Sequence, residues 1–253
     1  MPRAHADRQT VVVQALLQAR RQGEPVATVP DLPDAAAAYD VQEDIARWLG
    51  WFRRQVPRHW KSGGIPANHA FLPAFGVRST PARFNDLPEL FAVEAEIAMR
   101  LGQSVSAHEA TTMTTPEAWS LIDAVCVAIE VVVSRWVEGQ RAPRWCRLAD
   151  LQSHGGLVIG PWRTTRRWQP ADRSKLQGHL QVGAQKVDIS ASHPLGDPAS
   201  VLPAWLRHVT RKGLQVPAGT IVTTGAWGGM HEARRGDRVI AVLDKLRPAE
   251  LHW

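Results

Sequence analysis

The segment from Val125 to Val133 places a single carboxylate in the middle of a continuous apolar run rich in β-branched residues. Such a run is typical of a strand that is buried on both faces. A buried carboxylate without a partner is costly, so it normally becomes neutral, pairs with a cation or coordinates a metal ion. Glu130 is therefore predicted to be paired or to bind a metal. Arg135 has the opposite side-chain parity and is expected to point away, which leaves a more distant Lys or Arg as the alternative partner.

A second segment, residues 91–101, carries two more carboxylates in an alternating pattern. Its larger apolar residues share one parity, whereas Glu94 and Glu96 share the other, so on a strand both carboxylates leave the same face. Two convergent anions repel each other unless one is protonated or a cation lies between them. Taken alone, such a pair on a strand is more often the solvated face of an antiparallel sheet. Together with Glu130, the pair would form an all-oxygen site suited to Mg²⁺ or Mn²⁺.

Helical patterns come first along the chain, and short strands follow. One helix is predicted over 10–21, and a second is expected from an N-cap at Asp34 to Leu49, ended by Gly50. Two further helices are expected from Thr115 to about Val125 and from Asp197 to about Lys212. Strands are predicted at 92–101, 127–136, 156–160, 179–189, 220–224 and 238–246. The fold class is α+β, with a helical N-terminal region over 1–55 and a strand-rich body over 56–253.

The distribution of charged and apolar residues limits the classes of partner that the chain is expected to bind. The net charge of +6 is spread over short groups of basic residues, none a run of five, so nucleic acid is not predicted and small anionic substrates are favoured. No apolar stretch approaches the roughly 18 residues of a membrane span, and the N-terminus does not resemble a secretory signal. Cys126 and Cys146 are expected to be reduced thiols. We therefore expect a cytoplasmic protein without a membrane partner.

A series of short motifs, each weak alone, is specific in its combined order and spacing. The motifs are Ala38–Gln42, Trp60-Lys61, Val93–Ala98, Thr115–Ala118, Ile122–Val125, Ala128–Val132, Ser134-Arg135, Gly155–Gly160, Thr223–Gly225 and Gly236–Val239. Through them the chain resembles the 2-keto-4-pentenoate hydratase (2-hydroxypentadienoic acid hydratase) and oxalocrotonate decarboxylase branch of the fumarylacetoacetase superfamily. The resemblance extends over nearly the whole chain.

The resemblance implies a mixed β-roll of the fumarylacetoacetase type with a helical N-terminal part, and a homo-oligomer that serves aromatic compound catabolism. It also implies that Glu94, Glu96 and Glu130 bind Mg²⁺ or Mn²⁺ and that Lys61 is catalytic. Three polar residues of the family pattern are replaced by Val133, Leu151 and Ala226. The polar groups that select the substrate are thus expected to differ from those of the family.

The implied reaction is the addition of water to a small 2-hydroxy-dienoate or 2-oxo-alkenoate through a metal-stabilised enolate, which gives a 4-hydroxy-2-oxo acid. Lys61, beside a cation, is expected to have a lowered pKa and to act as acid or base. His154 is a second acid–base candidate, although a loop histidine is more often exposed; the same holds for Asn68 and His69. Alternatives are a 2-oxo acid decarboxylase, an acylpyruvate C–C hydrolase, or a non-catalytic anion-binding homologue with a degenerate pocket.

The glycine-rich segment 225–229 has two interpretations. Its backbone amides would be free to approach an anion, but it lacks the spacing of a phosphate-binding loop, so a plain turn is the preferred prediction.

Overall fold

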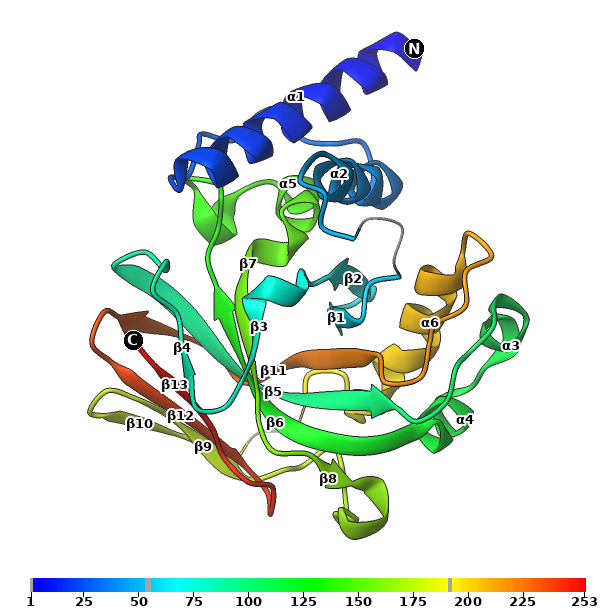
Figure 1. The fold of residues 1–253 in the computed structure, drawn as a ribbon, viewed down its shortest axis with the longest axis vertical. Coiled ribbons are helices and arrows are strands. Elements are labelled where there is room, and N and C mark those ends of the chain that lie inside the picture. Colours follow the sequence, from blue (N-terminus) through cyan, green and yellow to red (C-terminus); the bar gives the residue numbers. More distant parts are fainter. Residues whose placement is uncertain (1, 53–55, 191–192) are drawn as a thin grey trace. The chain divides into compact units, whose positions relative to one another are not determined.

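The computed structural model describes residues 2–52, 56–190 and 193–253, and the chain forms two compact units (Figure 1). The helical unit comprises residues 1–55 and 133–155, and the strand-rich unit comprises 56–132 and 156–253. The boundary predicted at residue 55 falls within 53–55, outside the described residues, and the domain division stays a prediction. Residues 133–155, which the sequence places in the strand-rich body, pack with the N-terminal helices.

Among its described residues, the helical unit has three α-helices and two 3₁₀ helices: α1 (Pro2–Gln22), α2 (Ala35–Trp48), Gly139–Arg141, α5 (Arg144–Ala149) and Leu151–Ser153. Asp34 caps α2 as predicted, because its side chain accepts a hydrogen bond from the amide of Ala37. Apolar faces of the three α-helices close a core that includes Leu16, Val41 and Trp136. The predicted helix over 10–21 is therefore confirmed as part of a longer α1.

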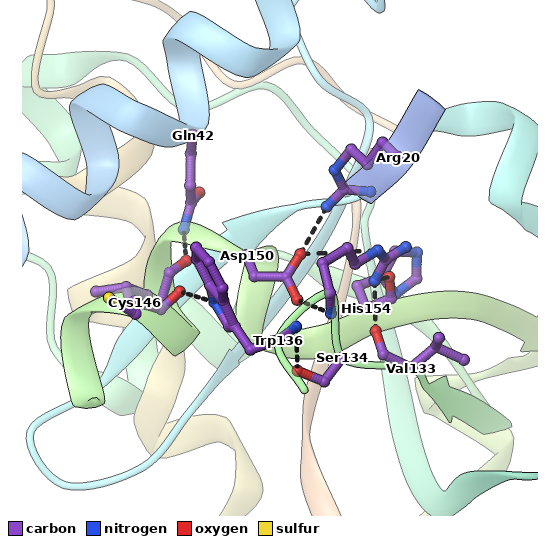
Figure 2. A network of polar contacts seen from close by, with 10 residues as sticks. Arg20, Gln42, Val133, Ser134, Trp136, Cys146, Asp150 and His154 are labelled. Atoms are coloured by element: carbon purple, nitrogen blue, oxygen red, sulfur yellow. Dashed lines mark hydrogen bonds and ion pairs between the residues drawn. The ribbon is translucent and has the colours of Figure 1, made fainter. Parts of the chain in front are cut away.

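A buried polar network crosses this unit (Figure 2). The carboxylate of Asp150 is fully buried and accepts hydrogen bonds from Arg20 Nη2 at 3.0 Å and from the amide of Arg135 at 2.9 Å. The Arg135 guanidinium donates to the carbonyls of Val133 and His154. Because a buried charge is tolerated when it is paired and hydrogen-bonded, this network ties α1 to the chain that follows β6.

The strand-rich unit contains two sheets (Figure 1). The eight-stranded sheet has the order β2-β1-β11-β5-β6-β7-β3, with β8 paired to β6. Its strands are β1 (His59–Gly63), β2 (Asn68–Phe71), β3 (Val77–Ser79), β5 (Leu90–Leu101), β6 (Ile122–Val132), β7 (His154–Ile159), β8 (Arg163–Thr164) and β11 (Ile221–Arg234). The five-stranded sheet has the order β10-β9-β12-β13-β4. Its strands are β4 (Ala82–Arg83), β9 (Gly178–Val182), β10 (Gln185–Ile189), β12 (Arg238–Leu243) and β13 (Ala249–His252).

Short helices connect these strands: 3₁₀ helix Ala74–Gly76, α3 (Ala107–Thr112), α4 (Thr115–Ser120), 3₁₀ helix Thr165–Arg167, 3₁₀ helix Pro198–Val201 and α6 (Leu202–Thr210). None of the helices in the described ranges is long and apolar enough to cross a membrane.

Several predicted elements are wrong in extent. The strand expected over 127–136 is β6, which begins at Ile122 and ends at Val132, and the strand expected over 220–224 is only the first part of β11. The helix expected to reach Val125 ends at Ser120, because the β-branched run that follows pairs as β6 from Ile122. The strand expected over 179–189 is the hairpin of β9 and β10, which turns at Gly183 in the left-handed region with φ +56°. The last predicted helix begins as a 3₁₀ turn after Asp197 and becomes α-helical only at Leu202.

Candidate metal centre

Three carboxylates converge in the eight-stranded sheet. Strands β5 and β6 pair antiparallel with Glu94 directly opposite Glu130, and Glu96 leaves the same face of β5 two residues later. One oxygen from each of the three side chains lies within 4.8 Å of the other two. Glu96 and Glu130 are buried and Glu94 is half-buried. The arrangement brings together the three residues that the sequence singles out, and their oxygens form a compact all-oxygen donor set.

Lys61 is the cationic partner of Glu130. It lies on β1, which pairs parallel with β11, and β11 in turn pairs with β5. Its Nζ donates a hydrogen bond to Glu130 Oε1, and the side chain is buried. Lys61 is therefore a basic partner of Glu130 from a distant part of the sequence, as one alternative expected. Arg135, as expected, faces elsewhere and contributes to the network of the helical unit.

The charges in this group shift one another's pKa. Burial, and next the charge of Glu130, raise the pKa of both Glu94 and Glu96 to about 8, although Lys61 acts in the opposite direction. Burial lowers the pKa of Lys61, but the carboxylates of Glu130, Glu94 and Glu96 outweigh burial, so its pKa is raised. The lowered pKa expected for Lys61 beside a cation is thus reversed among the carboxylates.

A bulge in β11 brings a backbone donor to Glu96. Thr223 pairs with Ala98 and Ala226 pairs with Glu96, so Thr224 and Gly225 together lie opposite one residue of β5. Gly225 has φ +99°, a conformation that favours glycine. Its amide donates to Glu96 Oε2 at 3.1 Å. The plain turn predicted for 225–229 is therefore wrong, because the segment is an irregular part of a long strand.

The two histidine candidates, His154 and His69, lie in different surroundings. His154 is the first residue of β7, belongs to the helical unit and is buried rather than exposed; its acid–base role stays a prediction. His69 on β2 is buried, with its Nδ1 2.9 Å from Ser62 Oγ and its ring centroid 4.8 Å from that of His208 on α6. Burial, followed by the charges of Arg211 and Arg207, lowers the pKa of His69 to about 4. His69 is therefore neutral at pH 7.

The chain is similar in sequence to known proteins. Residues 62–250 match the family described as Fumarylacetoacetate (FAA) hydrolase C-terminal. The 2-keto-4-pentenoate hydratase of Paraburkholderia xenovorans (strain LB400) is 28% identical over 245 residues, which cover 88% of this chain and 87% of the relative. The 2-keto-4-pentenoate hydratase 2 of Dechloromonas aromatica (strain RCB) is 29% identical over 249 residues and 92% of each chain.

Solved structures share the fold. The 4-oxalocrotonate decarboxylase from Pseudomonas putida G7, complexed with magnesium and adipate, superposes with a TM-score of 0.79 at 18% identity, over 96% of this chain and 97% of its own. The fumarylpyruvate hydrolase from Pseudomonas aeruginosa, in complex with Mn²⁺ and pyruvate, gives 0.56 at 16% identity, over 78% and 89%. The predicted α+β fold of the fumarylacetoacetase type is confirmed.

Proposed function

Because the chain belongs to the fumarylacetoacetate hydrolase C-terminal family, we propose that it is a divalent-metal-dependent hydratase, a carbon–oxygen lyase. In this proposal it adds water to a small 2-hydroxy-dienoate or 2-oxo-alkenoate and releases a 4-hydroxy-2-oxo acid. The observation that carries the proposal is the convergence of Glu94, Glu96 and Glu130 beside Lys61. Relatives named 2-keto-4-pentenoate hydratase, which align with about nine-tenths of the chain, favour hydration.

The three carboxylates fit a divalent cation. When all are ionised, three negative charges face one ammonium, so two negative charges are left over in a largely buried place. The raised pKa of Glu94 and Glu96 has burial as its main cause, and a cation would relieve this cost. Glu94, Glu96 and Glu130 would hold Mg²⁺ or Mn²⁺, which suit oxygen ligands. The bound ion would supply Lewis-acid polarisation of the substrate's carboxylate and C2 oxygen.

The protein's own groups hold protons and orient ligands. Lys61 keeps a proton at Nζ beside Glu130, and we assign to it proton transfer at C3 of the substrate. The amide of Gly225 orients the carboxylate of Glu96. The burial of Lys61, Glu96 and Glu130 limits competition from water. His154 stays a candidate for the second acid–base group, which would deliver the proton or the water at the distal carbon.

The first experiment follows 2-hydroxypenta-2,4-dienoate with the protein and Mg²⁺. We expect loss of the dienol absorbance and formation of 4-hydroxy-2-oxopentanoate, both abolished by EDTA and restored by excess Mg²⁺ or Mn²⁺. Glu94→Gln should bind metal more weakly and turn over more slowly, whereas Glu89→Gln, an exposed change near the start of β5, serves as the matched control. Turnover that is indifferent to EDTA would refute the metal-dependent mechanism.

Decarboxylation is the second candidate function, because the decarboxylase structures match almost the entire chain. The same assay with an oxalocrotonate distinguishes the two, since carbon dioxide release without hydration of the dienoate assigns the protein to decarboxylation. An acylpyruvate panel tests C–C hydrolysis, the reaction class of the fumarylpyruvate hydrolase neighbour. Metal binding without turnover of any of these acids would instead indicate a non-catalytic anion-binding homologue.

We also propose that the protein is a cytoplasmic homo-oligomer that takes small anionic 2-oxo acids. This proposal rests on the family resemblance, and the net charge of +6 supports an anionic substrate. Light scattering after size-exclusion chromatography measures the mass in solution, and a mass of one 27.9 kDa chain at micromolar concentration would contradict the assembly.

A further inference from the structure

We infer that His193 is a positioning residue that holds the Thr224–Gly225 bulge of β11, so that the amide of Gly225 orients the carboxylate of Glu96. The consequence for metal binding rests on the proposed role of Glu96 as a ligand. His193 lies outside every motif that pointed to the site, yet it is 3% exposed and contacts the bulge directly.

The bulge creates backbone groups that the ladder does not satisfy. Thr224 and Gly225 lie opposite a single residue, Ile97, so the regular pairing of β11 with β5 is interrupted there. Thr224 Oγ1 donates to the carbonyl of Ile97 at 3.1 Å, and the amide of Gly225 turns to Glu96 Oε2. The carbonyl of Thr224, on the peptide bond that carries this amide, still needs a donor in a buried place.

His193 supplies that donor. Its Nε2 lies 3.0 Å from the carbonyl oxygen of Thr224, and its Nδ1 lies 3.3 Å from the amide nitrogen of Leu195. A carbonyl can only accept and an amide can only donate, so the ring must be neutral with its proton on Nε2. Burial lowers the pKa of His193, although hydrogen bonds to the backbone of Thr224 and Gly225 act in the opposite direction. The lowered pKa agrees with a neutral ring.

His193 is held in place through both its backbone and its ring. The amide of His193 donates to the carbonyl of Ser174 at 2.8 Å, and its carbonyl accepts from the amide of Gly196 at 2.9 Å. The ring centroid lies 5.0 Å from that of Trp227, which is buried in the same strand as the bulge. His193 therefore holds the peptide plane between Thr224 and Gly225 in one orientation.

That peptide plane joins the histidine to the proposed metal ligand. The carbonyl of Thr224 and the amide of Gly225 belong to one rigid planar unit, so holding the oxygen also fixes the direction of the N–H. The N–H in turn fixes one oxygen of Glu96. Groups that orient ligands in this indirect way typically change metal affinity by 10- to 100-fold when they are removed.

The test compares His193→Leu, which removes the donor, with His193→Gln, whose amide nitrogen can replace Nε2. Calorimetric titration of the EDTA-treated and dialysed proteins with Mn²⁺ should show a Kd raised about 10-fold or more in His193→Leu and within about 3-fold of wild type in His193→Gln. Hydrogen exchange at the Gly225 amide, followed by NMR without metal, should be faster in His193→Leu and near the wild-type rate in His193→Gln.

Val209→Ala, a buried truncation in α6, controls for general loss of stability and should keep the wild-type Kd. If His193→Leu does not fold, His193→Asn replaces it, because the shorter amide does not reach Thr224; the same loss is expected. Unchanged Mn²⁺ affinity in the donor-free variant, or an equal loss in His193→Gln, overturns the inference. Failure of the wild-type protein to bind Mn²⁺ overturns the proposed function instead, and the exchange rates then decide alone whether His193 holds the bulge.

Discussion

Glu130 is a carboxylate in a strand whose other residues are all apolar except Asp123, and its environment explains why the sequence can tolerate it. Lys61 donates to it from β1, and Glu94 lies opposite it on β5. An ion pair buried in this way is costly to break, because the remaining charge has no solvent to compensate for the lost partner. The residue is thus a sensitive point for both stability and chemistry.

Removing one member of the pair should be worse for stability than removing both. We expect Lys61→Met to lower the free energy of unfolding by about 3–5 kcal/mol, because three largely buried carboxylates then remain without their ammonium, whereas Glu130→Gln leaves Lys61 beside Glu94 and Glu96 and should cost less. The double variant Lys61→Met/Glu130→Gln should recover a large part of that loss without recovering turnover. Urea denaturation in EDTA measures both effects, and additive losses in the double variant would show that the two side chains are not coupled in the folded protein.

The raised pKa values of Glu94 and Glu96 give stability a pH dependence of known sign. Both groups have a folded pKa of about 8, above the ordinary 4.5, so the folded state binds more protons than the unfolded state between these values. In EDTA, the free energy of unfolding should therefore fall as the pH rises from about 5 to 8. The raised pKa of Lys61 leaves this window unaffected, because that side chain is protonated throughout in both states.

The measurement is urea denaturation at pH 5.5, 7 and 8.5, and Glu96→Gln should flatten the profile. Saturating Mg²⁺ should abolish most of this pH dependence, because the ion displaces the protons from these oxygens in the folded state and the unfolded carboxylates are already ionised above about pH 5.5. A stability in EDTA that increases over this range would mean that the two carboxylates are not shifted upward.

At the scale of elements, the turn between α5 and β7 has the most unusual backbone conformation. Leu151, Gln152 and Ser153 have φ of 52°, 54° and 62°, so three consecutive residues other than glycine lie in the left-handed region. Asp150, just before them, carries the buried contacts to Arg20 and Arg135. The network holds the turn in a conformation that the residues themselves disfavour.

Replacing Gln152 with glycine should relieve part of this cost and raise the free energy of unfolding by about 1 kcal/mol. Gln152 suits the test because its side chain is only partly buried, whereas Leu151→Gly at an equally left-handed position also removes a buried side chain and should destabilise the protein. Thermal denaturation of Gln152→Gly and of Leu151→Gly, each compared with the wild-type protein, measures the two effects. Destabilisation by Gln152→Gly would show that its side-chain contacts outweigh the backbone strain.

The elements also show where local sequence patterns mislead. The parity of Glu94 and Glu96 and the apolar run around Glu130 predicted two central strands, because alternation and β-branching are properties of the strands themselves. The strand β11 was predicted as five residues but has fourteen. Its glycines resemble a turn locally, and only pairing with β5 shows that Gly225 belongs to a bulge.

At the scale of the whole molecule, the carboxylate site makes stability depend on the ion. Ligands that bind only the folded state stabilise it by mass action, so Tm should rise with Mn²⁺ or Mg²⁺ concentration and return to the starting value in excess EDTA. A rise of about 2.7 kcal/mol in the free energy of unfolding is expected at a hundred times Kd. Glu94→Gln should shift the curve to higher metal concentrations, and an equal response would place the ion elsewhere.

The sequence predicted the longer helices, the central strands β5 and β6 and all three converging carboxylates. It did not predict short elements such as β1, β2, β13 and α5, or how the chain interleaves its two units. Residues 133–155 join the N-terminal helices through contacts such as Gln42 Nε2 to the carbonyl of Leu148, at 2.7 Å and 106 positions apart. No local pattern reports a contact of that separation. The role of His193 could not be predicted for the same reason. Its contact with β11 joins residues 31 positions apart, and no local motif surrounds the histidine.

The ammonium of Lys61 has a consequence for how such a protein matures. A lysine tethered to β1 is a built-in counter-ion, present at the same local concentration whatever the cell contains. Three acids can therefore be buried together before any dissolved ion is captured. Folding and metal uptake are therefore expected to be separable events.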